Sequence, residues 1–312
     1  MQNPASFKST RAARIALAML TIAYALNFID RQILVILQES IKVDMGLSDV
    51  QLGLLSGFSF ALVYITAGIP IAYWADRGNR RNIIALAVAV WSGMTALSGL
   101  AANYTQLLLA RIGVGIGEAG GSPPAHAIIS DYYPPHKRGG ALAIYSMGLH
   151  FGILLGFLFG GLISEMFGWR MAFMAVGLPG VLFALVFYFV VQEPERGRWE
   201  TASQAAYKPT LRETMQLLKS YRSFWYIAAG TGFTAFVGYG NGNFAPSFLI
   251  RSHGFSVGEV GVILAFFGGG AGMIGALLGG FLADKLGTRD KRWYVWLPAC
   301  ASLLAVPLSF PY

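Results

Sequence analysis

The sequence predicts an all-α integral membrane protein, and three observations lead to this fold class. Of the 312 residues, 55% are hydrophobic and only 12% are charged, which is about half the charged share of a soluble domain. The 39 glycines fall inside apolar runs, and a single cysteine, Cys300, excludes a disulfide scaffold. Apolar runs of about 20 residues, the length that crosses a bilayer as a helix, recur along the chain.

Eight complete membrane spans are predicted, at residues 12–38, 48–74, 83–102, 104–129, 139–164, 169–192, 224–250 and 257–283, and a ninth begins near Trp293. The first span is too long for a signal peptide, carries Asp30-Arg31 near its end and lacks a small-residue cleavage site. We expect a cytoplasmic N-terminal tail (1–11), a six-helix bundle (12–192), a cytoplasmic linker (193–222) and the start of an incomplete second bundle (223–312).

The loops predict the orientation of the chain. One side, made of the N-terminus and the loops at 75–82, 130–138, 193–222 and 284–292, carries 18 Lys and Arg residues, whereas the other side carries three. Such an excess marks the cytoplasmic side. The net charge of +8 therefore requires no nucleic-acid partner, and we expect a multi-pass protein of the plasma (inner) membrane with a cytoplasmic N-terminus.

A sequence repeat relates the two parts of the chain. Asp76-Arg77 follows the second predicted span and Asp284-Lys285 follows the eighth, each within a small-x-x-Ala-Asp-basic pattern, at an offset of 208 residues. Two such matches indicate a duplicated half. By continuation of the repeat, we expect the protein to extend for roughly 90–110 further residues.

These motifs resemble the major facilitator superfamily. Within it, Asn27-Phe-Ile-Asp30-Arg31 and Arg111-Ile-Gly-Val-Gly-Ile-Gly-Glu118-Ala119 resemble the Spinster-like branch, as does Asn79 in the loop after the second span. The resemblance covers essentially the whole chain. It implies the major facilitator fold, with a six-helix N-terminal bundle followed by the first two to three helices of the second bundle.

The basic loops are the candidate cytoplasmic gate. In the family, the loop after the second span latches the two halves together. The resemblance assigns this role to Asp76, Arg77, Arg80 and Arg81, and to Asp284, Lys285 and Arg289 in the repeat. The alternative is topology alone, since arginines there satisfy the charge bias regardless of any gate. An aspartate in both halves favours the gate.

Four ionisable residues inside the spans are the candidate functional site: Asp30, Arg31, Arg111 and Glu118. Each costs roughly 2.5–3.5 kcal/mol in the membrane interior, so four are not incidental. Asp30 and Arg111 are expected at the same depth, about 10 Å from the outer end, and are the favoured ion pair. Arg31 and Arg111 would hold an anion. Asp30 and Glu118 are the candidates for proton exchange.

Other polar residues are expected around this site. His150 is either a proton partner of Glu118 or a packing histidine. Tyr24 and Asn27 lie on the first span, and the repeat places the substrate-binding candidates Tyr239, Asn241 and Asn243 at positions equivalent to 27–31.

Glycine patterns in the spans predict close helix packing. The pattern Gly115-x-Gly117-x-x-Gly120 matches a dinucleotide-binding fingerprint, but it lies in an apolar span and not in a βαβ unit. The glycines at 148, 152, 156 and 160 form one smooth face, and those from 268 to 280 are expected to behave likewise. Phe157 stands where the family's antiporter signature has proline, so this stretch does not predict antiport.

We therefore expect a monomeric secondary transporter that works by alternating access and is coupled to protons. No metal cluster, cofactor motif or catalytic constellation is visible, so an enzyme is not expected. The Spinster-like resemblance implies a lysophospholipid or sphingoid phosphate as substrate, whereas a small organic anion or drug-like compound would need the same arginines. A transport-inactive receptor or sensor is the alternative of another class.

Overall fold

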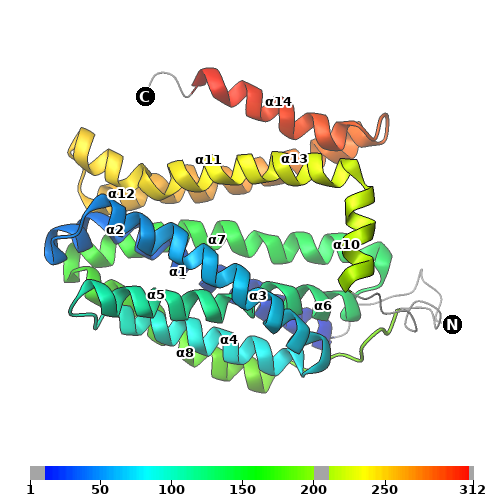
Figure 1. Cartoon of the computed structure of the whole chain (residues 1–312), viewed down its shortest axis with the longest axis horizontal. Coiled ribbons are helices and arrows are strands. Elements are labelled where there is room, and N and C mark those ends of the chain that lie inside the picture. Colours follow the sequence, from blue (N-terminus) through cyan, green and yellow to red (C-terminus); the bar gives the residue numbers. More distant parts are fainter. Residues whose placement is uncertain (1–10, 200–210, 309–312) are drawn as a thin grey trace.

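The computed structural model describes residues 11–199 and 211–308. Within these ranges the chain is helical and forms no β-strand, which confirms the all-α prediction. Figure 1 shows the long helices lying side by side along the longest axis of the molecule. Helix α10 (Leu211–Ser220) runs across their ends and leads from one group of helices to the other. It lies in the stretch that the sequence predicted only as a charged linker.

The first group, called the first half below, consists of α1 (Arg11–Met45), α2 (Asp49–Gly53), the π-helical segment η2 (Leu54–Phe58), α3 (Ser59–Arg77), α4 (Arg80–Ser98), α5 (Tyr104–Ala119), α6 (Ser122–Tyr132), α7 (Pro135–Phe167) and α8 (Trp169–Val190). The second half consists of α11 (Arg222–His253), α12 (Val257–Leu264), the π-helical segment η3 (Ala265–Gly270), α13 (Ala271–Gly287) and α14 (Trp293–Leu308).

Six helical stretches of the described chain are long and apolar enough to cross a membrane, and they correspond to six of the eight predicted spans. The fourth predicted span is wrong as a single helix, because it breaks at Gly120–Gly121 into α5 and α6. The prolines at 123 and 124 cannot extend the preceding helix, but the first turn of a new one tolerates them. The seventh predicted span forms the 32-residue α11, which is not among the six.

The helix ends reproduce the repeat. Gly46 follows α1 with a φ of 65°, and Gly254 follows α11 with a φ of 71°, a left-handed conformation that glycine adopts without strain. Two residues later, Ser48 and Ser256 each form a capping box at the start of α2 and α12. Both correspondences have the offset of 208 residues that the sequence predicts, so the two halves share their turn chemistry as well as their motifs.

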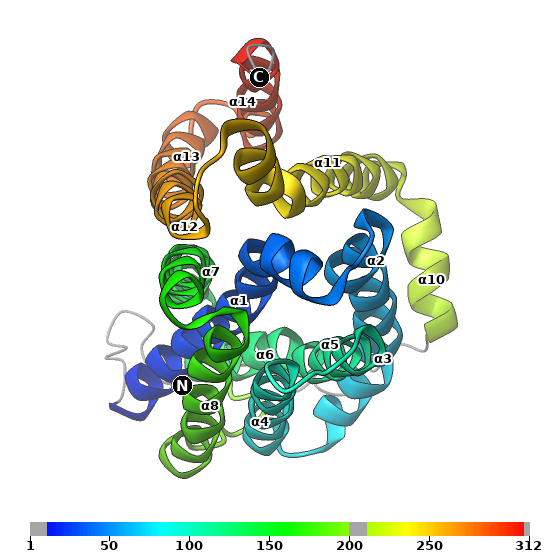
Figure 2. The same cartoon turned by 90° about the vertical axis from the view of Figure 1, so that its left-hand side faces the viewer.

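Helix α7 lies between α1 and the second half (Figure 2). Its predicted glycine face packs against α1: a Cβ atom at Gly152 would lie 2.5 Å from the carbonyl oxygen of Ala25 and 2.5 Å from Cβ of Phe28. On another face of α7, a Cβ atom at Gly161 would lie 2.9 Å from Cα of Gly261 in α12. Both contacts confirm that these glycines allow the backbones to approach closely.

The two halves contact each other toward one end only. Gly269 and Gly272 still pack against α7, but a Cβ atom at Gly275, Gly279 or Gly280 would meet nothing within 4 Å. The packing predicted for residues 268 to 280 is therefore correct only in its first part. The halves separate toward the end that carries the two aspartate loops.

Candidate functional site

Arg31 and Glu118 form an ion pair between α1 and α5. Nε of Arg31 donates a hydrogen bond to Oε2 of Glu118 over 2.7 Å. The Glu118 side chain is completely buried, whereas that of Arg31 is 19% exposed. The pair therefore presents its cationic member to the more accessible side.

Asp30 and Arg111 are buried beside this pair, at 1% and 2% exposure. They interact electrostatically with each other, but no ion pair within 4 Å joins them among those of the described residues. The predicted Asp30–Arg111 ion pair is thus not formed. Residues 30 and 31 point about 100° apart on one helix, so the rotation that brings Arg31 to Glu118 leaves Asp30 near the hydroxyl of Thr95 in α4.

Several polar atoms of this cluster have no hydrogen-bond partner within the described chain. They are Oδ2 of Asp30, Oε1 of Glu118, and Nε and Nη1 of Arg111. Buried polar groups are normally paired, because an unpaired group costs about 1–3 kcal/mol or more when charged. Unused acceptors and donors are a property expected of a site that exchanges protons or ligands.

Aromatic rings surround the Arg31 guanidinium. Its central carbon lies 4.8 Å from the ring centroid of Phe60, 5.1 Å from that of Phe28 and 5.4 Å from that of Tyr64, all within the range of cation–π interactions. These three residues were not predicted from the sequence. The spacing of four between Phe60 and Tyr64, which places them on one helix face, was the available signal.

The other predicted lining residues on α1 lie next to the cluster. Asn27 is buried beside the Glu118 carboxylate. Tyr24 stacks on Tyr145 with ring centroids 4.5 Å apart. Tyr24 also lies within electrostatic range of Arg31. The structure therefore brings these α1 residues together with the ion pair.

The predicted site residues of α11 and α7 differ in their surroundings. Tyr239 of α11 is exposed and interacts electrostatically with Arg31, but no hydrogen bond joins the two among the described residues. Asn241 is exposed and Asn243 half-buried, and the structure shows no polar contact for either within the described residues. His150 does not pair with Glu118; it faces α13, where a Cβ atom at Gly272 would lie 3.1 Å from its Nδ1.

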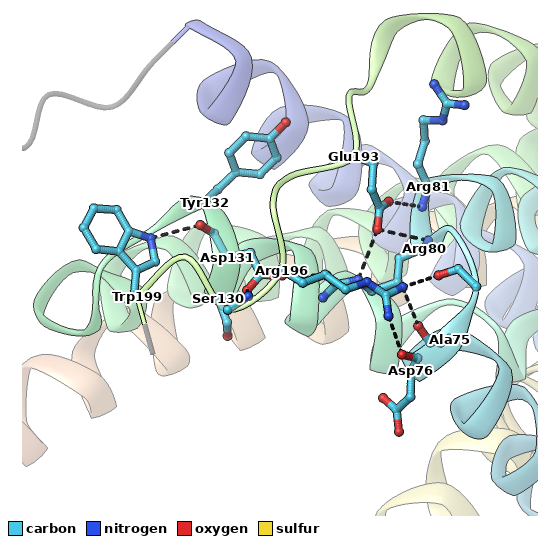
Figure 3. A network of polar contacts seen from close by, with 12 residues as sticks. Ala75, Asp76, Arg80, Arg81, Ser130, Asp131, Tyr132, Glu193, Arg196 and Trp199 are labelled. Atoms are coloured by element: carbon cyan, nitrogen blue, oxygen red, sulfur yellow. Dashed lines mark hydrogen bonds and ion pairs between the residues drawn. The ribbon is translucent and has the colours of Figure 1, made fainter. Parts of the chain in front are cut away.

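The basic loop after α3 forms a polar network centred on Arg80 (Figure 3). Nη2 of Arg80 lies 2.6 Å from Oδ2 of Asp131 in α6, and its Nε lies 3.2 Å from Oε1 of Glu193, which follows α8. The backbone amide of Arg81 donates to the same Glu193 carboxylate over 2.8 Å. The network ties three helix ends of the first half to one another.

Arg196 completes this network and was not predicted. Its guanidinium donates to the backbone carbonyls of Ala75, Asp76 and Gly78. The Asp76 side chain is exposed, and in Figure 3 its carboxylate points away from the arginines. No ion pair joins the Asp76 carboxylate to an arginine among the described residues.

The remaining gate candidates also make contacts within their own half. Arg77 lies over the ring of Tyr73, and Arg81 over that of Tyr188. In the second half, the Tyr294 hydroxyl donates to Asp284 over 3.4 Å.

Lys285 and Arg289 are exposed. Within the described chain, no ion pair joins the Asp76 loop to the Asp284 loop, in keeping with the separation of the halves at this end. The latch between the two aspartate loops stays a prediction, which concerns a conformation in which these loops meet.

At the opposite end, Arg251 of α11 joins the two halves. Its Nη2 lies 2.6 Å from Oε1 of Glu39 in α1 and 2.6 Å from Oδ1 of Asp49 in α2. Nε and Nη1 donate to the second oxygens of the same carboxylates over 3.0 and 3.2 Å. The two carboxylates raise the pKa of Arg251 above its ordinary value. The sequence identifies Arg251 only as one of three basic residues on the predicted outer side.

The chemistry of the central site is that of protons and anions. Among the described residues no three His, Cys, Asp or Glu side chains group together in a way that could hold a metal ion. Two guanidinium groups and two carboxylates can exchange partners with each other, with a proton or with a ligand carrying negative charge.

The chain belongs to the Major Facilitator Superfamily, whose family model matches residues 20–312. It is a multi-pass membrane protein with the major facilitator fold. Within the superfamily it is of the Spinster-like type, as the two motifs predicted. A bacterial homologue of the human lysosomal transporter Spinster, solved in an inward-facing and unoccupied conformation, is 41% identical with a TM-score of 0.79, over 90% of this chain and 64% of that chain.

Two further relatives match most of the chain. An MFS-type efflux pump of Mycolicibacterium smegmatis is 37% identical over 96% of this chain and 69% of its own length. A probable L-galactonate transporter of Escherichia coli is 27% identical over 89% of this chain and 64% of its own length. The chain thus spans about two thirds of the length of each of these three proteins.

Proposed function

We propose that the protein is a proton-coupled secondary transporter that works by alternating access, as a monomer in the plasma (inner) membrane with its N-terminus in the cytoplasm. The observation that carries the proposal is the buried cluster of two arginines and two carboxylates, with the Arg31–Glu118 ion pair at its accessible side. Buried ionisable residues within membrane spans mark substrate and proton pathways.

The coupling follows from competition for Arg31. In the ion pair, the Glu118 carboxylate occupies the guanidinium. Protonation of Glu118 removes that negative charge and frees Arg31 for the anionic group of a substrate. By linkage, each event then favours the other, so the proton and the anion occupy the same state of the carrier. Arg111, which has unused donors, holds the buried side positive while Glu118 is neutral.

Alternating access would use the two ends of the molecule in turn. Arg251 holds the halves together at the end where they meet, while the Asp76 and Asp284 loops lie apart. In the opposite state, we propose that Arg251 releases its carboxylates and the two aspartate loops form the gate. Asp76, Arg77, Arg80 and Arg81 would then contact the loop of Asp284, Lys285 and Arg289.

The proposed substrate is an amphiphile with one anionic head, such as a lysophospholipid or sphingoid phosphate. The head would bind Arg31, and the rings of Phe28, Phe60 and Tyr64 together with Tyr239 would contact its apolar part. A small organic anion is the second candidate, because the relative named as a probable L-galactonate transporter shares 27% of its residues with this chain.

The test uses the full-length protein in liposomes that contain a trapped pH-sensitive dye. The liposomes are challenged with a lysophospholipid below its lytic concentration and, separately, with galactonate. We expect one class to trigger proton movement that Glu118→Gln abolishes. Glu195→Gln, the same chemical change at an exposed linker residue, is the matched control and should leave the flux unchanged.

The other outcomes contradict defined parts of the proposal. Substrate movement without proton movement would refute the coupling, and an unchanged flux in Glu118→Gln would refute the role of that carboxyl. Saturable binding of a substrate class with no flux would refute transport and favour the receptor or sensor.

A further inference from the structure

A groove lies where α1 and α7 begin, at the end of the molecule that carries the basic loops. Its volume is about 550 Å³, and the side chains of Arg14, His136 and Lys137 line it together with apolar residues, among them Leu17 and Ile144. No step of the proposed transport cycle uses this groove.

The side chains that line the groove make it positively charged. Its lining within the described chain contains no acidic side chain. The first acidic residue of the sequence is Asp30, and none occurs between Asp131 and Glu165. Asp131 itself is paired with Arg80. The first turns of α1 and α7 carry no acidic residue either, so the positive ends of both helix dipoles add to the field of the side chains.

An apolar surface continues from the groove along both helices. Leu17 is buried beneath it, and Ile144 is 50% exposed. Further along the helices, Ile22 of α1 and Phe151 of α7 are 45% and 43% exposed. Figure 2 shows the beginning of α1 between α7 and α8 at the periphery of the molecule, away from α3 and α5. A ligand here would meet cations at the end of the bundle and apolar side chains toward its middle.

We propose that this groove binds the headgroup of an anionic phospholipid from the surrounding leaflet. The phosphodiester contacts Arg14, His136 and Lys137, and the acyl chains lie along Ile22 and Ile144. Basic pockets between helices at the cytoplasmic face suit such headgroups, because each Lys or Arg near an anionic lipid contributes attraction. A soluble anion would gain the same charges but nothing from the apolar walls, so the lipid is the occupant that uses both features.

The first test measures which lipid the full-length protein retains. The protein is reconstituted into bilayers of phosphatidylcholine doped with phosphatidylglycerol, and bound lipids are counted by native mass spectrometry. The wild type should prefer phosphatidylglycerol. Arg14→Gln with Lys137→Gln should reduce that preference about 30-fold, as expected for the loss of two cations. The matched control is Lys291→Gln with Arg292→Gln, which removes two exposed basic residues elsewhere at the same end.

The second test fills the groove without changing its charge. Gly140 lines the groove, and a Cβ atom there meets nothing within 4 Å, so Gly140→Leu should fold normally and still displace the headgroup. Gly139 is equally free of neighbours but does not line the groove, and Gly139→Leu is the control. Loss of phosphatidylglycerol from the first variant alone supports the site.

Three results would overturn the proposal. Equal losses in the groove pair and in the control pair would show that the general surface charge attracts the lipid. Equal behaviour of Gly140→Leu and Gly139→Leu would show that the groove is not the binding place. Displacement of phosphatidylglycerol by inorganic phosphate would show that the site recognises a free anion and not a lipid.

Discussion

Removing the Arg251 side chain should open the end of the molecule at which the two halves meet. Arg251 is the residue of α11 that forms ion pairs with both Glu39 of α1 and Asp49 of α2. In Arg251→Ala both carboxylates lose this partner at once. The helices of the first half stay intact, because neither carboxylate depends on Arg251 to hold its own helix.

The magnitude follows from the exposure of the groups. Arg251 and Asp49 are 38% and 53% exposed, while Glu39 is 12% exposed. Ion pairs at such exposed positions contribute about 0.2–1 kcal/mol each, so the two together contribute about 0.5–2 kcal/mol. That free energy changes the ratio of the two conformations by about 2- to 30-fold.

The assay is a distance measurement between spin labels on the two halves. Labels are placed at Val43 on α1, which is 83% exposed, and at the exposed Ser252 on α11, in a background with Cys300→Ser. In Arg251→Ala we expect the population with the longer separation to rise by the factor above. Arg251→Lys, which keeps the charge but loses the forked geometry, should give an intermediate result.

Arg170 supplies the matched control. It forms a 2.6 Å ion pair with Asp44 at the same end, with both side chains similarly exposed, but both residues belong to the first half. Arg170→Ala should leave the distance distribution unchanged. If both alanine variants shift the distribution equally, or if neither does, the role assigned to Arg251 is wrong.

Three further substitutions have expected outcomes. Gly152→Ala should lower the thermal unfolding midpoint in detergent, because its Cβ would lie 2.5 Å from α1 atoms and overpacking costs about 1–3 kcal/mol. The control is Gly232→Ala, whose Cβ would meet nothing within 4 Å and which should not lower the midpoint. Arg80→Gln should lower the thermal unfolding midpoint and the yield of folded protein, since it leaves the Asp131 carboxylate without its cation, a loss of about 3–5 kcal/mol. An unchanged thermal unfolding midpoint would argue against the network. Phe60→Leu should weaken binding of an anionic amphiphile about 2- to 5-fold in equilibrium titrations, since the cation–π contact with Arg31 contributes about 0.5–1 kcal/mol, and stronger binding would contradict the proposed contact.

The membrane spans and the repeat could be predicted from the sequence for physical reasons. A spanning helix must satisfy its own backbone hydrogen bonds within an apolar stretch, so hydropathy and length identify it. The repeat extends to the turns, where Gly46 and Gly254 adopt the same left-handed conformation. The two prolines that follow Gly120–Gly121 also indicate the helix break, but hydropathy alone does not reveal it.

The pairing of charged side chains could be predicted only in part. Depth along the bundle placed Asp30 and Arg111 at the same level, yet depth does not fix the rotation of a helix. The rotation of α1 brings Arg31, and not Asp30, into an ion pair, and its partner is Glu118. Arg80 pairs with residues 51 and 113 positions away. Such partners depend on how distant helix ends meet, and no local pattern encodes that.

The central claim is that binding of an anion to Arg31 and of a proton to Glu118 favour each other. It is tested most directly by calorimetric titration of the full-length protein with its anionic substrate in two buffers of different ionisation enthalpy, which counts the protons taken up on binding. We predict uptake of up to about one proton per bound anion at a pH where Glu118 is ionised in the free protein, and none in Glu118→Gln. Binding without proton uptake in the wild type, or uptake that Glu118→Gln leaves unchanged, would contradict the claim.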